Sequence, residues 1–123
     1  MRFEIDERQP IYRQITDALI RQIARGDWPP GGRLPSIREV AETARVNPNT
    51  VARAFQELER TGLVETRRGE GTFVTNDTQA IKACREKTAR EIWADFLVKI
   101  RELGFTNEEV QRLVAELKEG KEK

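Results

Sequence analysis

Apolar residues recur at helical spacing near the start of the chain and predict an amphipathic helix there. Four of them follow one another every four residues: Ile11, Ile15, Leu19 and Ile23. This spacing places them on one face of a helix, which must pack against a core. Pro10 suits the first position of such a helix, and Gly26 suits the position just beyond its last turn.

Two further apolar stretches, each preceded by a capping residue, predict a helix-turn-helix. Ser36, with Glu39 three residues later, forms a capping box for the first of these helices. Asn47 caps the next helix, which has Pro48 at its first position and is expected to run to about Thr61. The short gap between the two helices is typical of the turn in a helix-turn-helix.

A glycine-tipped β-hairpin is predicted directly after these helices. Residues 63–66 and 72–75 have the pattern of two short strands, and the loop between them contains Gly69 and Gly71. A helix-turn-helix followed by such a hairpin is the plan of a winged helix. The predicted fold class is therefore mainly α with a small β-hairpin.

The remainder of the chain predicts two more helices. One extends from about Gln79 to Leu103, and Thr106 with Glu109 forms the capping box of the last. We expect a winged helix-turn-helix DNA-binding domain at 1–76 and a two-helix segment at 77–123. Two such helices cannot by themselves enclose a sizeable ligand pocket, which usually needs roughly 300 Å³ or more.

The long fourth helix carries more apolar residues than one packed face needs, and this surplus predicts a homodimer. The expected interface residues are Ile92, Trp93, Phe96, Leu97 and Ile100. Two-fold symmetry would set two recognition helices on one face of a duplex, about 34 Å apart for half-sites one turn apart. The alternative is a monomer in which the helical pair folds back onto the winged domain.

The third helix has one face suited to reading DNA. At about 100° per residue, the side opposite its apolar face carries amide and guanidinium groups and no carboxylate. These residues are Asn49, Arg53, Gln56 and Arg60. Amide side chains pair with adenine and guanidinium groups with guanine in the major groove. The pattern is short, so chance is the competing explanation.

The hairpin and the start of the second helix add further candidates. Arg67 and Arg68 bring positive charge to the hairpin, and its glycines either allow close backbone approach to DNA or simply make the turn. Arg33 and Arg38 flank a helix N-terminus that can seat a phosphate, or else they are surface arginines paired with glutamates. The full set of DNA-binding candidates is Arg33, Ser36, Arg38, Asn47, Asn49, Thr50, Arg53, Arg67, Arg68, Gly71 and Thr72.

The distribution of positively charged residues along the chain is more informative about DNA binding than the net charge. The net charge is only +1, but residues 1–76 hold twelve Arg and no Lys, whereas residues 77–123 hold four Arg and six Lys. Arginine has a planar fork that suits phosphates and guanine edges. Compositional drift would produce the same bias.

Composition also argues against catalysis. The chain has no histidine, the commonest general base and transition-metal ligand. Ser36 and Cys84 therefore lack a histidine partner, and no metal-ligand cluster is present. We expect no enzyme activity, no cofactor and no metal. Cys84 allows no intrachain disulfide and is expected in a core or interface, with a redox role left open.

No stretch is long enough to cross a bilayer, and the first residues do not resemble a signal peptide, so we expect a cytoplasmic protein with no membrane partner.

Several segments, in the right order, resemble the GntR family of bacterial transcription regulators. They are residues 10–15, 30–38, 49–51 and 69–74, together with Ala54 and Leu58. The resemblance implies that Arg38 reads the groove and that Thr50 and Gly71 approach DNA. Many members carry arginine where this chain has Pro48 and Ala52, so those base contacts cannot be carried over and the operator stays open.

Residues 46–54 and the short two-helix tail are similar to the YtrA subgroup of this family. That subgroup implies a repressor, often linked to a transporter operon. A small-molecule effector at the dimer interface is possible on this reading, with its identity unknown. A winged-helix module that binds other proteins and no specific DNA remains the alternative.

Overall fold

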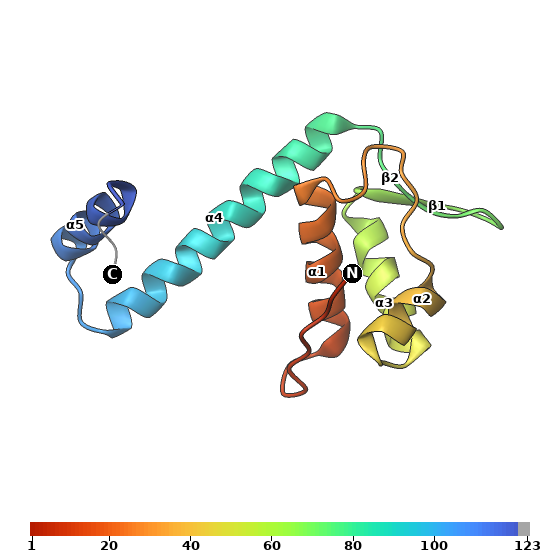
Figure 1. The fold of residues 1–123 in the computed structure, drawn as a ribbon, viewed down its shortest axis with the longest axis horizontal. Coiled ribbons are helices and arrows are strands. Elements are labelled where there is room, and N and C mark those ends of the chain that lie inside the picture. Colours follow the sequence, from red (N-terminus) through yellow and green to blue (C-terminus); the bar gives the residue numbers. More distant parts are fainter. Residues whose placement is uncertain (121–123) are drawn as a thin grey trace. The chain divides into compact units, whose positions relative to one another are not determined.

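Five helices and one two-stranded hairpin make up residues 1–120, the part that the computed structural model describes (Figure 1). In chain order they are α1 (Ile11–Arg25), α2 (Ile37–Ala44), α3 (Pro48–Arg60), β1 (Val64–Arg67), β2 (Gly71–Val74), α4 (Thr78–Glu102) and α5 (Asn107–Lys118). Residues 121–123, which the sequence assigns to the two-helix segment, lie outside the described residues. The predicted class, mainly α with a winged helix-turn-helix, is confirmed.

The chain divides into two compact units, Met1–Arg85 and Glu86–Lys123. The first contains α1, α2, α3 and the hairpin, with α1 packed most extensively against α3. The predicted four-residue period is visible in its core, where Ile15 and Leu19 of α1 and Val51 and Leu58 of α3 are fully buried. Burial of such side chains is the main favourable contribution to folding of this unit.

Local chemistry explains where the helices begin. The Ser36 hydroxyl accepts a hydrogen bond from the Glu39 N–H, and the Glu39 carboxylate accepts one from the Ser36 N–H, which completes the predicted capping box. Asn47 Oδ1 accepts from the Asn49 N–H at 2.7 Å. These caps satisfy N–H groups that the first turn of a helix leaves without partners. Both helices of the helix-turn-helix therefore start where the sequence predicts.

The hairpin pairs Val64 with Val74 and Arg67 with Gly71, so each strand lies one residue away from its predicted bounds. The linker before α2 runs along β2 and pairs with it, which the sequence pattern does not predict. Its Leu34 N–H donates to the Thr72 carbonyl at 2.9 Å, and its Gly32 carbonyl accepts from the Val74 N–H at 2.8 Å. The hairpin extends beyond α1, α2 and α3 as a wing (Figure 1).

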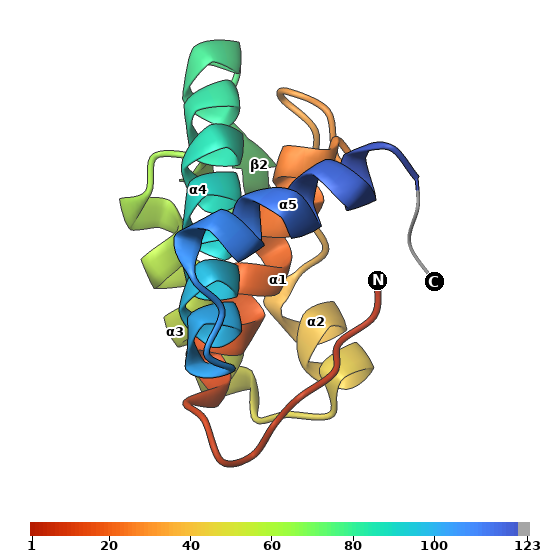
Figure 2. The ribbon, with the colours of Figure 1, turned by 90° about the vertical axis from the view of Figure 1, so that its left-hand side faces the viewer.

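The residues before α1 form an arm that the sequence pattern does not assign to any element. Phe3 and Ile5 pack against the core. Gln14 holds the arm to α1, since its Oε1 accepts from the Asp6 N–H and its Nε2 donates to the Asp6 carbonyl, both at 2.7 Å. Figure 2 shows the arm, in red, turning sharply just before α1.

Helix α4 begins in the first unit and continues into the second. Its Ile81 and Cys84 pack against the first core, so that compact unit extends beyond residue 76. None of the 25 residues of α4 is buried. In the second unit, α5 starts with the predicted capping box of Thr106 and Glu109, and its Val110 is buried.

Candidate nucleic-acid interface

The two sides of α3 differ as the sequence predicts. Val51, Ala54 and Leu58 are fully buried, whereas Asn49, Arg53 and Gln56 on the other side are exposed. Arg60 is also exposed, but its Nη1 lies 3.0 Å from Glu57 Oε1, so a carboxylate reaches this side near the helix end. The exposed N-terminal half of α3 thus presents amide and guanidinium groups with hydrogen-bond donors for base edges.

Arg53 has a partner on α1. Its guanidinium carbon lies 3.8 Å from the centroid of the Tyr12 ring, within the range of a cation–π contact. The Tyr12 hydroxyl in turn accepts a hydrogen bond from Arg13 Nε at 3.1 Å. Stacking occupies the face of the guanidinium plane and leaves its N–H edge available. Tyr12 was not among the predicted site residues, because nothing in the local pattern indicates that it meets α3.

The start of α3 is held by its own cap. The Asn47 side chain accepts a hydrogen bond from the Asn49 N–H, and Thr50 is half-buried in the first turn of the helix. Of the three candidates here, Asn49 is the one whose side chain is both exposed and without a capping role in the structure. The Asn47 amide oxygen therefore positions the start of α3, and its contact with DNA stays a prediction.

At the start of α2, Ser36 and Arg38 are both exposed. Arg38 Nε lies 3.3 Å from Glu42 Oε1, with the two side chains 88% and 69% exposed. The sequence left such a pairing open as the alternative to DNA contact. An exposed pair of this kind contributes about 0–1 kcal/mol to stability, so a DNA phosphate or base can displace it readily.

The capping box also changes the electrostatics at this helix end. Hydrogen bonds from the Ser36 backbone N–H, and then from its side chain, lower the pKa of Glu39 below its ordinary value. Glu39 is therefore a carboxylate at neutral pH, and its negative charge lies beside the seat that the sequence proposes for a phosphate. Its repulsion weakens phosphate binding by the N–H groups of the helix end. The nearby arginines are therefore the groups that favour a phosphate here.

The wing brings Arg33 and Gly71 together. Gly71 has a φ of +122°, and a Cβ built on it would lie 2.8 Å from Arg33 Nε. Arg33 belongs to the linker segment that pairs with β2, and it faces Phe73 across an isolated β-bridge. The positive φ favours glycine here, and a Cβ would push aside the Arg33 side chain, which is exposed. Thr72 is half-buried, and its carbonyl is used by Leu34.

The two arginines of the hairpin loop differ from each other. Arg67 is half-buried, with its guanidinium carbon 4.2 Å from the Phe73 ring centroid and its Nε 3.0 Å from Glu65 Oε1. Arg68 is exposed, and within residues 1–120 its side chain has no hydrogen bond or ion pair. Arg68 is thus the better placed of the two to contact a phosphate.

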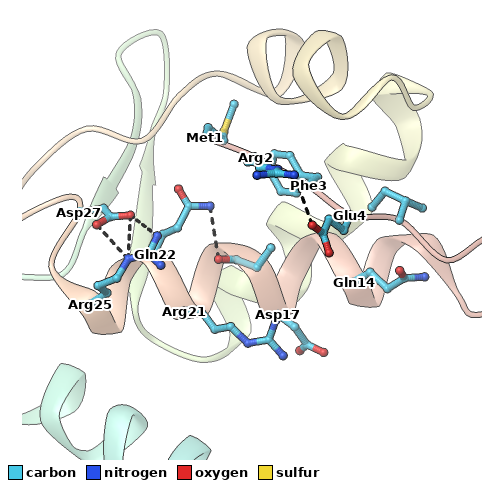
Figure 3. Close-up of a pocket in the computed structure, with 12 residues that line it drawn as sticks. Met1, Arg2, Phe3, Glu4, Gln14, Asp17, Arg21, Gln22, Arg25 and Asp27 are labelled. Carbon is cyan, nitrogen blue, oxygen red and sulfur yellow. Dashed lines mark hydrogen bonds and ion pairs between the residues drawn. The ribbon is translucent and has the colours of Figure 1, made fainter.

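A separate cleft lies between the arm and α1 (Figure 3). Its volume is about 630 Å³, and arginines and carboxylates line it together. Two of its arginines are already paired, Arg2 with Glu4 and Arg25 with Asp27. None of the predicted DNA-binding residues lines this cleft. Among the described residues, no group of three or more His, Cys, Asp or Glu side chains could hold a metal ion.

The second unit exposes part of the predicted dimer face. Ile92 is 55% and Trp93 48% exposed, whereas Phe96, Leu97 and Ile100 are half-buried. At about 100° per residue these five lie on one face of α4. The Trp93 and Phe96 rings stack with centroids 5.4 Å apart. Within the described residues, no helix is long and apolar enough to span a membrane.

Comparison with other sequences places this architecture among helix-turn-helix regulators. The pattern of the bacterial regulatory proteins of the gntR family matches residues 11–74. The HTH-type transcriptional regulator YhcF of Bacillus subtilis is 39% identical over 117 residues, which cover 95% of this chain and 97% of YhcF. The repressor YtrA of Bacillus subtilis is 44% identical over 78 residues, covering 62% of this chain and 60% of YtrA.

Solved structures give the same result. A GntR family transcriptional regulator from Listeria monocytogenes has a TM-score of 0.82 at 33% identity, covering 91% of this chain and 98% of that one. YtrA from Sulfolobus acidocaldarius has a TM-score of 0.58 at 32% identity, with coverages of 80% and 99%. The DNA-binding domain of AraR, solved in complex with its operator ORR3, has a TM-score of 0.51 at 28% identity, with coverages of 52% and 77%.

Proposed function

Because the chain belongs to the GntR family of helix-turn-helix transcription regulators, we propose that it is a repressor that binds a palindromic operator as a homodimer. The observation that carries this proposal is the exposed side of α3, where Asn49 and Arg53 face solvent. Its relatives are named as transcription regulators rather than enzymes.

In this proposal α3 enters the major groove. Asn49 and Arg53 contact base edges, Arg38 approaches the groove from α2, and Thr50 supports the approach of the helix. Arg33, Arg68 and the backbone at Gly71 contact the sugar–phosphate backbone or the minor groove through the wing. The AraR domain, whose fold this unit shares, was solved in complex with an operator, which supports DNA binding by this unit.

The dimer is proposed to form through α4. A helix of 25 residues with none buried, carrying exposed Ile92 and Trp93, leaves an apolar face that water disfavours. Pairing with a second copy buries this face and brings two reading helices to one duplex. A regulator of this kind acts in the compartment that holds the chromosome, which for a bacterium is the cytoplasm.

Repression rests on the similarity to YtrA, a named repressor. A link to a transporter operon rests only on the resemblance of residues 46–54 to the YtrA subgroup. The proposal leaves room for a small-molecule effector of unknown identity and needs no cofactor. The regulated genes follow from the operator once its sequence is known.

The direct experiment is selection of duplexes from a random pool by the whole chain, followed by affinity measurements over a range of salt. The proposal predicts an inverted repeat and an affinity that falls steeply with salt, because bound phosphates release counterions. A pool that yields no enriched sequence, with weak binding to every duplex, would favour the protein-binding module instead.

A further inference from the structure

Arg45 occupies a backbone conformation that ordinarily requires glycine. Its φ of 58° and ψ of 49° are left-handed, and within residues 1–120 it is the one non-glycine residue with positive φ. It ends α2, where its N–H donates to the Ala41 carbonyl. A left-handed conformation costs an L-residue with a Cβ about 1–2 kcal/mol relative to the right-handed region. Such strain persists only where something outweighs it.

Contacts within the chain do not explain the choice of arginine. The Arg45 side chain is exposed and has no hydrogen bond, ion pair or ring contact among the described residues. By contrast, Arg38, Arg60 and Arg67 each have a carboxylate partner. The conformation of Arg45 is supported by the C-cap of α2, since its own N–H and the Val46 N–H both donate to the Ala41 carbonyl. Its positive charge, however, has no partner within residues 1–120.

The position of Arg45 indicates which partner its charge could meet. It lies in the turn of the helix-turn-helix, two residues before Asn47, which caps α3. Arg45, Asn47 and Thr50 line the same hollow. Asp6, Glu7 and Arg8 also line it; the Asp6 carboxylate pairs with Arg8, whose Nε lies 3.0 Å away, and the Glu7 carboxylate has no ion pair among the described residues. The turn thus presents a free guanidinium beside the N-terminus of the reading helix.

We propose that Arg45 binds a phosphate of the DNA backbone at the edge of each half-site, as a contact independent of base sequence. The proposal rests on the proposed function, because it takes α3 to lie in the major groove. A helix that enters the groove by its N-terminal end brings the preceding turn to the flanking strand, where phosphate contacts position the protein. The charge of Arg45 is then paired in the complex by a charge-assisted hydrogen bond to the phosphate.

Arg45→Gly separates a role in DNA binding from a structural role, because it should raise the stability of the fold while it lowers the affinity for DNA. Removing the strained Cβ should raise the Tm by ~2–8 °C. Removing the charge should lower the affinity for the selected duplex about threefold to tenfold and reduce the slope of log K against log salt by about 0.9 for each phosphate that is no longer neutralised. The same factor should apply to an unrelated duplex, because a phosphate contact carries no sequence information.

Two controls complete the experiment. Arg45→Lys keeps both the charge and the strain and should retain most of the salt slope, whereas Arg21→Ala removes an exposed charge from α1 and should leave affinity unchanged. If Arg45→Gly raises the Tm while affinity and salt slope stay at the wild-type values, the phosphate contact is refuted and the proposed function stands. A wild-type chain that selects no duplex would overturn both.

Discussion

The Arg53 guanidinium on α3 stacks on the Tyr12 ring of α1, with its central carbon 3.8 Å from the ring centroid. One of the residues that we propose to read DNA, Arg53, thus also contacts α1, the helix against which α3 packs. A flexible arginine loses rotamer freedom when it binds, and a ring that already orients it lowers that cost. Tyr12 is on this account a positioning residue.

Tyr12→Leu should therefore weaken operator binding about twofold to fivefold, because a cation–π contact at an exposed site is worth about 0.5–1 kcal/mol. Tyr12→Phe keeps the ring and should bind almost as the wild type does, although it loses the hydrogen bond from Arg13. Fluorescence anisotropy on the selected duplex distinguishes the two variants. Equal affinities for Tyr12→Leu and Tyr12→Phe would show that the ring does not position Arg53.

Gly71→Ala and Gly69→Ala form a matched pair in the wing. Both glycines have positive φ, but a Cβ at Gly71 meets Arg33 whereas a Cβ at Gly69 meets nothing within 4 Å. Gly71→Ala should lower the free energy of unfolding by about 1–3 kcal/mol, and Gly69→Ala by about 1 kcal/mol. Denaturant titration measures both.

The two wing variants should also differ in DNA binding. Only Gly71→Ala displaces Arg33, so it should lose more operator affinity than Gly69→Ala at a temperature where both are folded. If the two variants bind equally well, Arg33 is not part of the interface.

Trp93→Glu should separate the dimer. Trp93 is 48% exposed, and a carboxylate there would be buried unpaired when a second copy docks. The two symmetric contacts should together weaken dimerisation by ~100-fold or more. Sedimentation velocity gives the oligomeric state. Val98→Glu is the control, because Val98 is 56% exposed and lies on the opposite side of α4. A dimer that survives Trp93→Glu but not Val98→Glu would place the interface on the other face.

The capping boxes predict a loss of stability at acid pH. Hydrogen bonds from Ser36 lower the pKa of Glu39, and hydrogen bonds from Thr106 do the same for Glu109. Because each folded-state pKa is below the unfolded value, this stabilisation is present above the ordinary glutamate pKa and is lost as the pH falls through the folded pKa. Both groups are solvent-exposed, so the effect is small.

Glu39→Gln retains a side-chain acceptor but does not titrate. Thermal melts should therefore show a Tm gap between wild type and Glu39→Gln that is largest near neutral pH and narrows toward about pH 3. A gap that stays constant over this range would mean that the Glu39 carboxylate gains nothing from its folded environment.

Features that depend on near neighbours in the chain were predictable from sequence. The capping box of Ser36 and Glu39 is set by two residues three apart, and the burial of Val51 and Leu58 follows from helical spacing. The exposure of Asn49 follows from the same spacing. These predictions are confirmed because no long-range contact competes with them.

Features that depend on residues distant in the chain were not predictable in the same way. The contact of Tyr12 with Arg53 and the approach of Arg33 to Gly71 arise only when separate elements pack together. The left-handed Arg45 has no signal in the sequence at all, since arginine ordinarily does not mark such a position. The roles that we propose for Tyr12, Arg33 and Arg45 therefore depend on contacts and conformations that only the structure shows.

The central claim is that the exposed side of α3 reads the operator, and affinity measurements with the selected duplex test it most directly. Asn49→Ala and Arg53→Ala should each lose about 1–3 kcal/mol of binding, roughly fivefold to 150-fold, and should relax preference at one position of each half-site. Arg21→Ala, an exposed arginine on α1, should bind as the wild type does. Wild-type affinity and wild-type base preference in both α3 variants would contradict the account.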